Sequence, residues 1–350
     1  MAKLNVLVTG GSGFLGSAVV RELIDQQSVL DVSAVRIFDI RPPVEYGDPR
    51  VSYFAGDICD QGTITEACRG IDLVIHTAAI VDWGTHPEHE VLAVNVAGTE
   101  NVVRACQSQR VPFLVFTSSL DAIYTGKPMV NVDDSSPYPP SHPNMYCKSK
   151  ELAERAVIAA NSASLRTVCI RPSDVYGEGD PYHIGSLVDM AKGGFYVRIG
   201  NGKAKSQHTY VGNVAYAHLL AAKSLMEDSP GVAGSAYLIT DGPGSNFFHF
   251  FDRIVEGIGY TIRPKNFWIP RPIAYAMGTM SEFIALLARP VKKYNPKFSR
   301  FAVTYTCTDF TFTSDKALKE IGFRPKYSER EALDRTIAFF RKQYLAGDQS

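Results

Sequence analysis

Residues 5–16 read Asn-Val-Leu-Val-Thr-Gly-Gly-Ser-Gly-Phe-Leu-Gly, and this stretch decides the fold. A short apolar run ends in three glycines, Gly10, Gly13 and Gly16, and apolar residues then recur at helical spacing through Ile24. A strand, a glycine turn and a helix form the context in which a glycine motif predicts a dinucleotide site. Glycines permit the tight turn and let the backbone approach a pyrophosphate at the helix N-terminus. The alternative is a tight strand–helix turn without a ligand.

A second predicted strand, residues 34–38, ends at Asp39. Asp39 stands near the offset at which an acidic side chain meets the ribose 2′-hydroxyl of NAD, and it would repel a 2′-phosphate. Arg41 follows two residues later and could accommodate such a phosphate in part. The sequence therefore favours NAD and leaves NADP open.

Four more strands follow in the pattern, each separated from the next by a helical stretch or a turn. We expect them at residues 51–54, 73–79, 113–116 and 166–170, with a long helix over 91–109. Strands that alternate with helices indicate a Rossmann-type, doubly wound parallel sheet, which binds ligands at the carboxyl ends of its strands. Polar or small residues stand at those ends: Asp57 and Ile58, then Ala78 and Ala79, then Ser118 and Ser119.

A loop rich in proline and serine, residues 130–144, precedes a predicted helix over 146–161. Tyr146 and Lys150 are four residues apart, so a helix places them on one face. A phenol beside an ammonium group should have a lowered pKa, because the positive charge favours the phenolate. Such a pair can move a proton to or from an alcohol oxygen near neutral pH. By itself the spacing also fits an ordinary surface helix.

The composition is that of a soluble globular protein. The chain has 350 residues, of which 45% are hydrophobic and 21% charged, and its formal net charge is zero. No overall field therefore attracts nucleic acid. The six cysteines are scattered, no signal peptide precedes the first strand, and no apolar run is long enough to cross a membrane. We expect a cytoplasmic protein with reduced thiols and no metal site.

Several short motifs, in order and at matching distances, make the chain resemble the extended short-chain dehydrogenase/reductases. They are TGGSGFLG (9–16), DI (57–58), HTAA (76–79), NVAGT (95–99), TSS (117–119), YCKSK (146–150) and RPSDVYG (171–177). Segments 199–202, 208–218, 236–242 and 316–323 resemble the 3β-hydroxysteroid dehydrogenase branch, which includes the sterol-4α-carboxylate 3-dehydrogenases.

The resemblance implies roles for individual residues. Tyr146 would be the general acid/base, Lys150 its partner and a ligand of the nicotinamide ribose, and Ser119, or else Ser118, would hold the substrate oxygen. The implied cofactor contacts are Gly10, Gly13, Phe14, Leu15, Gly16, Asp39, Asp57, Ile58, Ala78, Ala79, Tyr146, Lys150, Pro172 and Ser173.

We expect residues 1–177, with a returning segment near 207–242, to form the NAD-binding core. Residues 178–206 and 243–350 would bind the substrate. Basic residues for a nucleotide pyrophosphate are few there: Arg198, Lys203 and Lys205. An apolar helix over about 267–289 carries Ile273, Met277, Met280, Ile284 and Leu287 on one face, with Arg289, Lys292 and Lys293 after it. That face could close the core or pocket, or it could contact a membrane surface peripherally.

The sequence thus predicts an NAD(P)-dependent oxidoreductase that interconverts a 3β-hydroxyl and a 3-keto group on a steroid or sterol. Whether isomerisation or loss of a carboxylate accompanies that step cannot be read from these residues. Alternatives are a reductase of another bulky apolar ketone such as a long-chain β-keto acid, a nucleotide-sugar epimerase or dehydratase, and a cofactor-binding sensor without turnover. The resemblance also implies a homodimer that pairs helices 91–109 and 146–161 of each subunit.

Overall fold

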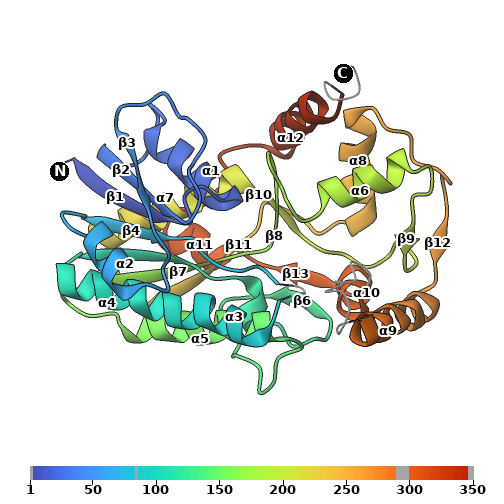
Figure 1. Ribbon diagram of the computed structural model, residues 1–350, viewed down its shortest axis with the longest axis horizontal. Coiled ribbons are helices and arrows are strands. Elements are labelled where there is room, and N and C mark those ends of the chain that lie inside the picture. Colours follow the sequence, from blue (N-terminus) through green and yellow to red (C-terminus); the bar gives the residue numbers. More distant parts are fainter. Residues whose placement is uncertain (1–2, 83–85, 289–298, 346–350) are drawn as a thin grey trace.

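The computed structural model describes residues 3–82, 86–288 and 299–345. A parallel sheet with helices on both faces occupies one half of the molecule, and helices with short strands form the other half (Figure 1). This arrangement confirms the predicted doubly wound fold.

Within the described residues the central sheet has seven strands, all parallel, in the order β11-β7-β5-β4-β1-β2-β3. From β1 the chain adds β2 and β3 toward one edge of the sheet, and from β4 it adds β5, β7 and β11 toward the other edge. The ligand crevice is therefore expected between the neighbours β1 and β4. The strands are β1 (Leu4–Thr9), β2 (Val32–Asp39), β3 (Val51–Ala55), β4 (Leu73–His76), β5 (Phe113–Thr117), β7 (Arg166–Pro172) and β11 (Ser235–Ile239).

Residues of β1 alternate between two cores, because neighbouring side chains of a strand point to opposite faces. Val6 and Val8 pack in the core under α1 and α7, whereas Leu7 packs in the core under α2, α4 and α5. Figure 1 shows α4 and α5 together below the sheet. The covering helices are α1 (Phe14–Ile24), α7 (Val211–Met226), α2 (Gln61–Ala67), α4 (Thr99–Gln109) and α5 (Met145–Ala159).

Three predicted elements differ in detail. The fourth strand ends at His76, so Ala78 and Ala79 lie in the turn after it. The long helix near 91–109 consists of α3 (Glu88–Leu92), one π-helical turn, η1 (Ala93–Gly98), and α4. Part of the predicted loop is a strand, β6 (Met129–Val132), because it pairs with β13 (Phe310–Phe312) from a part of the chain about 180 residues away.

The second half of the molecule is built from short pieces. Two parallel strand pairs, β8 with β10 and β9 with β12, connect its segments. Its elements are β8 (Asp174–Tyr176), α6 (Ile184–Lys192), β9 (Arg198–Ile199), β10 (His208–Tyr210), α8 (Phe247–Ile258), β12 (Trp268–Ile269), α9 (Arg271–Ala288), α10 (Arg300–Thr306) and α12 (Glu329–Leu345). Two further short helices pack on the sheet half: η2 (Leu120–Ile123) against α5, and α11 (Asp315–Glu320) against β11.

Helix α9 buries its small side chains and exposes its large ones. Ala274 and Ala285 are buried, and Gly278 lies against the backbone of Ser299 and Arg300, at the start of α10. The predicted apolar face is instead 47–64% exposed at Ile273, Met277, Met280, Ile284 and Leu287. The prediction that this face closes the core or pocket is therefore wrong. Arg289, Lys292 and Lys293 lie outside the described residues, and no described helix has the length and apolarity needed to cross a membrane.

Candidate active site

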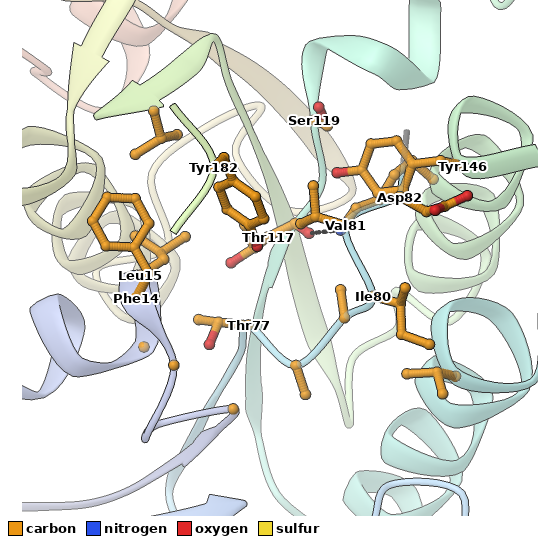
Figure 2. Close-up of a pocket in the computed structure, with 18 of the residues that line it drawn as sticks. Phe14, Leu15, Thr77, Ile80, Val81, Asp82, Thr117, Ser119, Tyr146 and Tyr182 are labelled. Atoms are coloured by element: carbon orange, nitrogen blue, oxygen red, sulfur yellow. Dashed lines mark hydrogen bonds between the residues drawn. The ribbon is translucent and has the colours of Figure 1, made fainter. Parts of the chain in front are cut away.

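Every residue that the sequence predicted for the site lines one cavity, of about 450 Å³, at the carboxyl edge of the sheet (Figure 2). The edge is even, because neighbouring strands end in register: Thr9 pairs with His76, His76 with Phe116, and Thr117 with Ile170. Loops that leave these strand ends therefore meet around a single space, which runs from the glycine loop to Tyr146.

The glycine loop fits a bound phosphate group. Gly10 has φ of +69°, and a Cβ there would lie 2.7 Å from the Cα of Ala78. A Cβ on Gly16 would lie 2.1 Å from the carbonyl oxygen of Gly10. In the described chain no side chain caps the N-terminus of α1. The amide groups of its first turn and the positive end of the helix dipole are therefore available to an anion.

Asp39 and Asp57 stand at the far end of the cavity from Tyr146. The Asp39 carboxylate accepts hydrogen bonds from the backbone amides of Ser12, at 3.1 Å, and Arg41, at 3.0 Å. These bonds fix the carboxylate between the glycine loop and the end of β2. Asp57 accepts from the amide of Cys59 at 2.9 Å and, with Ile58, borders the same end of the cavity.

Tyr146 and Lys150 project from the first turns of α5, which begins sharply because the Asn144 side chain accepts a hydrogen bond from the Cys147 amide at 2.8 Å. Both residues are buried. The Lys150 ammonium group donates to the carbonyl oxygen of Thr117, at the end of β5, at 3.0 Å, and lies 6.0 Å from the centre of the Tyr146 ring. The predicted pair is thus brought together at the end of β5.

The expected lowering of the Tyr146 pKa is wrong for the protein alone. Burial raises the pKa of Tyr146 well above its usual value, and the nearby Asp121 carboxylate raises it further. Lys150 is committed to the Thr117 carbonyl, and burial lowers its own pKa to about 8. Tyr146 is therefore a protonated phenol here, which suits the donation of a proton to an oxygen that gains negative charge.

The two serines after β5 differ in their surroundings. Ser119 begins the short helix η2; its hydroxyl donates to an Asp121 carboxylate oxygen at 2.8 Å and accepts from the Asp121 amide at 3.1 Å. Its hydrogen bonding lowers the pKa of Tyr146, which opposes the effect of burial. Figure 2 shows the Ser119 hydroxyl on the same side of the cavity as the Tyr146 hydroxyl. Ser118 also lines the cavity, and its buried hydroxyl has no hydrogen-bond partner among the described residues.

Pro172 and Ser173, at the end of β7, form the next wall of the cavity. Ser173 is fixed by its backbone bond to the Ile239 carbonyl at 3.0 Å and by a side-chain bond to Thr209. The preceding residue, Arg171, makes two hydrogen bonds to Glu154 of α5, at 2.9 and 2.6 Å, and both side chains are buried. This ion pair braces the helix that carries Tyr146 against the strand that carries Pro172.

Comparison with known proteins identifies the family. Residues 7–270 match the model of the 3-beta hydroxysteroid dehydrogenase/isomerase family. A decarboxylating sterol-4-alpha-carboxylate 3-dehydrogenase of Schizosaccharomyces pombe is 31% identical over 344 residues, which is 96% of this chain and 97% of the relative. The mouse (Mus musculus) protein of the same description is 33% identical over 336 residues, 95% of this chain and 90% of the relative.

The chain belongs to the 3-beta hydroxysteroid dehydrogenase/isomerase family. A solved structure with the same fold is the enzyme WbmH of Bordetella bronchiseptica in complex with NAD+, with a TM-score of 0.72 and 18% identity over 97% of this chain and 99% of that one. As a member of this family the protein is an NAD(P)-dependent oxidoreductase of the 3β-hydroxysteroid or sterol dehydrogenase type.

Four features of this candidate site were not predicted from the sequence. Asp121 contacts Ser119; Tyr182 stands over the cavity in Figure 2; and Phe301 and Tyr305 of α10 complete the wall. The fourth is Asn95, in the π-helical turn, which bonds both backbone groups of Ile80 and the hydroxyl of Ser149 in α5. π-helical turns are rare overall, but those that occur lie frequently at functional sites. The sequence carries no signal that predicts one here.

The part of the cavity around Tyr146 and α10 has a mostly apolar and aromatic wall. Of the three basic residues considered for a pyrophosphate, Arg198 is buried against Asp252, at 2.8 Å, and none of the three lines the cavity. The described cationic residues that do line it are Arg41, at the Asp39 end, Lys150, and His183, which is paired with Asp174 and Asp180. Elsewhere in the described chain no cluster of three or more His, Cys, Asp or Glu is placed to hold a metal ion.

Proposed function

We propose that the protein interconverts a 3β-hydroxyl and a 3-keto group on a steroid or sterol, with NAD as the hydride carrier. One observation carries the proposal: Tyr146, Lys150 and Ser119 share a cavity with the glycine loop, and the wall around them is apolar and aromatic. A small number of placed polar groups within an apolar wall is typical of sites for flat hydrophobic ligands.

The chain supplies proton transfer and positioning. When bound, the cofactor exchanges a hydride with the carbinol carbon of the substrate. Tyr146 would donate a proton to the substrate oxygen in reduction, or take one in oxidation. Lys150, held by Thr117, would stabilise the phenolate and bond the nicotinamide ribose, and Ser119 would hold the substrate oxygen beside Tyr146.

The remaining predicted residues would hold the cofactor. The glycine loop, with Gly10, Gly13 and Gly16, and the backbone amides of Phe14 and Leu15 in the first turn of α1 would bind the pyrophosphate. Asp39 would bond the adenosine ribose and thereby favour NAD over NADP. The other contacts would be Asp57 and Ile58 at the adenine, Ala78 and Ala79 along the dinucleotide, and Pro172 and Ser173 at the nicotinamide.

The substrate class rests on the cavity wall and on the names of the relatives. Two relatives are described as decarboxylating sterol-4-alpha-carboxylate 3-dehydrogenases, so loss of a 4-carboxylate after oxidation is the companion activity to test first. A nucleotide-sugar substrate is disfavoured because Arg198 is committed to Asp252. Residues 178–206 and 243–350 would form most of the substrate-binding region.

An absorbance assay of NADH tests the proposal on 3β-hydroxysterols with and without a 4α-carboxylate, long-chain β-keto acids and UDP-sugars. We expect turnover with sterols only. Tyr146→Phe should lower that turnover by about a thousandfold or more while cofactor affinity stays within a few-fold, because only the proton donor is removed. Turnover of UDP-sugars alone, or near-normal activity of the Phe variant, would overturn the assignment.

We also propose a homodimer in which α4 and α5 of two subunits form a four-helix interface. The outward side of α5 presents Lys148, Leu152 and Arg155 to solvent. Gel filtration with light scattering should give twice the mass of the chain, and Leu152→Glu should shift it toward the monomer. A monomeric wild-type protein at micromolar concentration contradicts this.

Finally, we propose that the exposed face of α9 contacts a phospholipid surface peripherally. Seven large apolar side chains of this helix are between 42% and 64% exposed: Ile273, Tyr275, Met277, Met280, Phe283, Ile284 and Leu287. The sequence from 289 to 297 adds Arg289, Lys292, Lys293 and Lys297 and contains no acidic residue. Apolar residues beside basic ones match an anionic membrane surface.

A further inference from the structure

Two groups of Asp121, its carboxylate and its backbone amide, hydrogen-bond the hydroxyl group of Ser119. Its carboxylate oxygen Oδ2 accepts the Ser119 proton at 2.8 Å, and its backbone amide donates to the Ser119 oxygen at 3.1 Å. A hydroxyl group offers one proton and two lone pairs. With the carboxylate ionised, the Ser119 proton and one lone pair are used, and one lone pair remains for a donor in the cavity, which is the Tyr146 phenol or a bound substrate.

The remaining lone pair of Ser119 distinguishes the two forms of the substrate oxygen. An alcohol can donate to the remaining lone pair of Ser119, but a ketone oxygen has no proton to donate. When Asp121 is protonated, its O–H can donate to the second lone pair, and the Ser119 proton becomes free for the cavity. Ser119 then offers a donor, which a ketone oxygen and an alcohol oxygen can both accept.

We propose that Asp121 is a positioning residue that sets, through its protonation, whether Ser119 accepts from or donates to the substrate oxygen. Ionised Asp121 then disfavours the ketone and leaves the alcohol almost unaffected. This inference rests on the proposed reaction, whose two partners are that alcohol and that ketone. Because release of the ketone is eased, the ionised state suits a site that oxidises alcohols.

The surroundings of Asp121 place the change at a useful pH. Removal from water raises the pKa of Asp121 to about 6, and the Asp174 carboxylate contributes to the rise, whereas Lys150 opposes it. Asp174 is itself paired with His183, at 3.3 Å, and His208, at 3.1 Å. The titratable or charged groups that face Asp121 come from α5, β8, α10 and the end of η2: Tyr146, Cys147, Lys150, Asp174, Tyr305 and Tyr124.

Equilibrium binding of a saturated 3-ketosteroid and of the matching 3β-hydroxysteroid tests the proposal. The ketone is titrated into enzyme saturated with NAD+, and the alcohol into enzyme saturated with NADH, so that neither complex reacts. Between pH 5 and 7.5 we expect the affinity for the ketone to fall about five- to tenfold, the value of one hydrogen bond. The affinity for the alcohol should change less than twofold.

Two variants separate Asp121 from other titrating groups. Asp121→Asn keeps the shape but cannot ionise, so it should remove the pH dependence for the ketone. Asp134→Asn is the matched control: Asp134 has a pKa likewise raised to about 6 by burial, but it bonds the Leu238 amide and does not line the cavity. It should behave as wild type.

The outcomes are distinct. A pH-independent ketone affinity in the wild type, or an unchanged pH dependence in Asp121→Asn, overturns the role of Asp121 while the proposed reaction stands. The second result would assign the titration to a group other than Asp121. If neither steroid binds at any pH, the proposed reaction and this inference both fall.

Discussion

Lys150 illustrates at the residue scale how function opposes stability. Its ammonium group is buried, and burial lowers its pKa to about 8 from 10.5. A basic group whose pKa is lower in the folded protein than in the unfolded chain destabilises the fold. The full penalty applies at any pH below the folded-state pKa, and it disappears as the pH rises from there to the unfolded-state pKa. At pH 7 the shift from 10.5 to about 8 corresponds to about 3.5 kcal/mol at most, because each pKa unit is worth about 1.4 kcal/mol.

Lys150→Met should therefore stabilise the protein at pH 7 without cofactor, by about 1–2 kcal/mol after the lost bond to Thr117 is counted. Turnover should be nearly abolished in the same variant. Urea denaturation at pH 7 and at pH 10 measures the difference, and the advantage of Met should shrink at the higher pH. A variant that is less stable than wild type at pH 7 would show that the penalty of burial is already offset.

At the same scale, we expect Asp39 to govern the choice between NAD and NADP. The carboxylate accepts from two backbone amides, so its removal alters both charge and loop structure. Asp39→Ala should narrow the preference for NAD over NADP about tenfold or more, because the repulsion of a 2′-phosphate is lost. Asp39→Asn keeps an oxygen that can accept from the Ser12 and Arg41 amides, and it should narrow the preference for NAD by a similar factor. Ratios of kcat/KM for the two cofactors measure this, and a wild type that already prefers NADPH strongly contradicts the role of Asp39.

At the scale of elements, the Arg171–Glu154 pair connects β7 to α5. Removing one partner of a buried ion pair leaves an uncompensated charge, at a cost of about 3–5 kcal/mol. Arg171→Met should destabilise the protein by that amount, and the double variant Arg171→Met/Glu154→Leu should recover most of it. The control is Arg155→Met on the same helix, because the Arg155 side chain is 55% exposed and its pair with Glu151 is worth at most about 1 kcal/mol. Equal losses in Arg171→Met and Arg155→Met would contradict a special role of the buried pair.

The elements also show what the sequence could and could not predict. Strands of the central sheet were found because they are short apolar runs between turn residues, a local signal. Local composition predicts a loop at strand β6, because it does not encode the contact with the pairing partner, β13, which is far away in the chain. Periodicity located the apolar face of α9 but could not predict which face packs against the rest of the protein. The face with the small residues Ala274, Gly278 and Ala285 is the buried one, because small residues allow close packing.

On the scale of the whole molecule, the carboxyl edge of the sheet gathered every predicted site residue, because the fold itself determines where strand ends meet. The walls contributed by α10 and by the loop with Tyr182 were not predictable in this way. Phe301 and Tyr305 reach the cavity from a segment about 150 residues beyond Tyr146, and only tertiary packing brings them there. The second half of the molecule therefore contributes the walls that would contact the substrate, and the turnover assay on sterols, β-keto acids and UDP-sugars identifies that substrate.

The arrangement of that half leads to a prediction about membranes. Figure 1 places α9 at the end of the molecule away from the N-terminus, beside α10, which lines the cavity. A lipid-like substrate could therefore leave a bilayer close to the site. At low salt the protein should sediment with anionic phospholipid vesicles, and at high salt it should be released. The reason is that salt screens the attraction between basic residues and anionic headgroups.

Met280→Glu/Ile284→Glu tests whether α9 is the contact, because both side chains are more than half exposed and the change should leave the fold intact. Burial of each apolar side chain is worth about 1.5–3 kcal/mol, so the double variant should bind vesicles at least about tenfold more weakly. The matched control is Phe339→Glu on α12, an exposed apolar residue of another helix, which should sediment as wild type does. Wild-type protein that stays in the supernatant, or equal binding by all three proteins, would exclude α9 as a membrane contact.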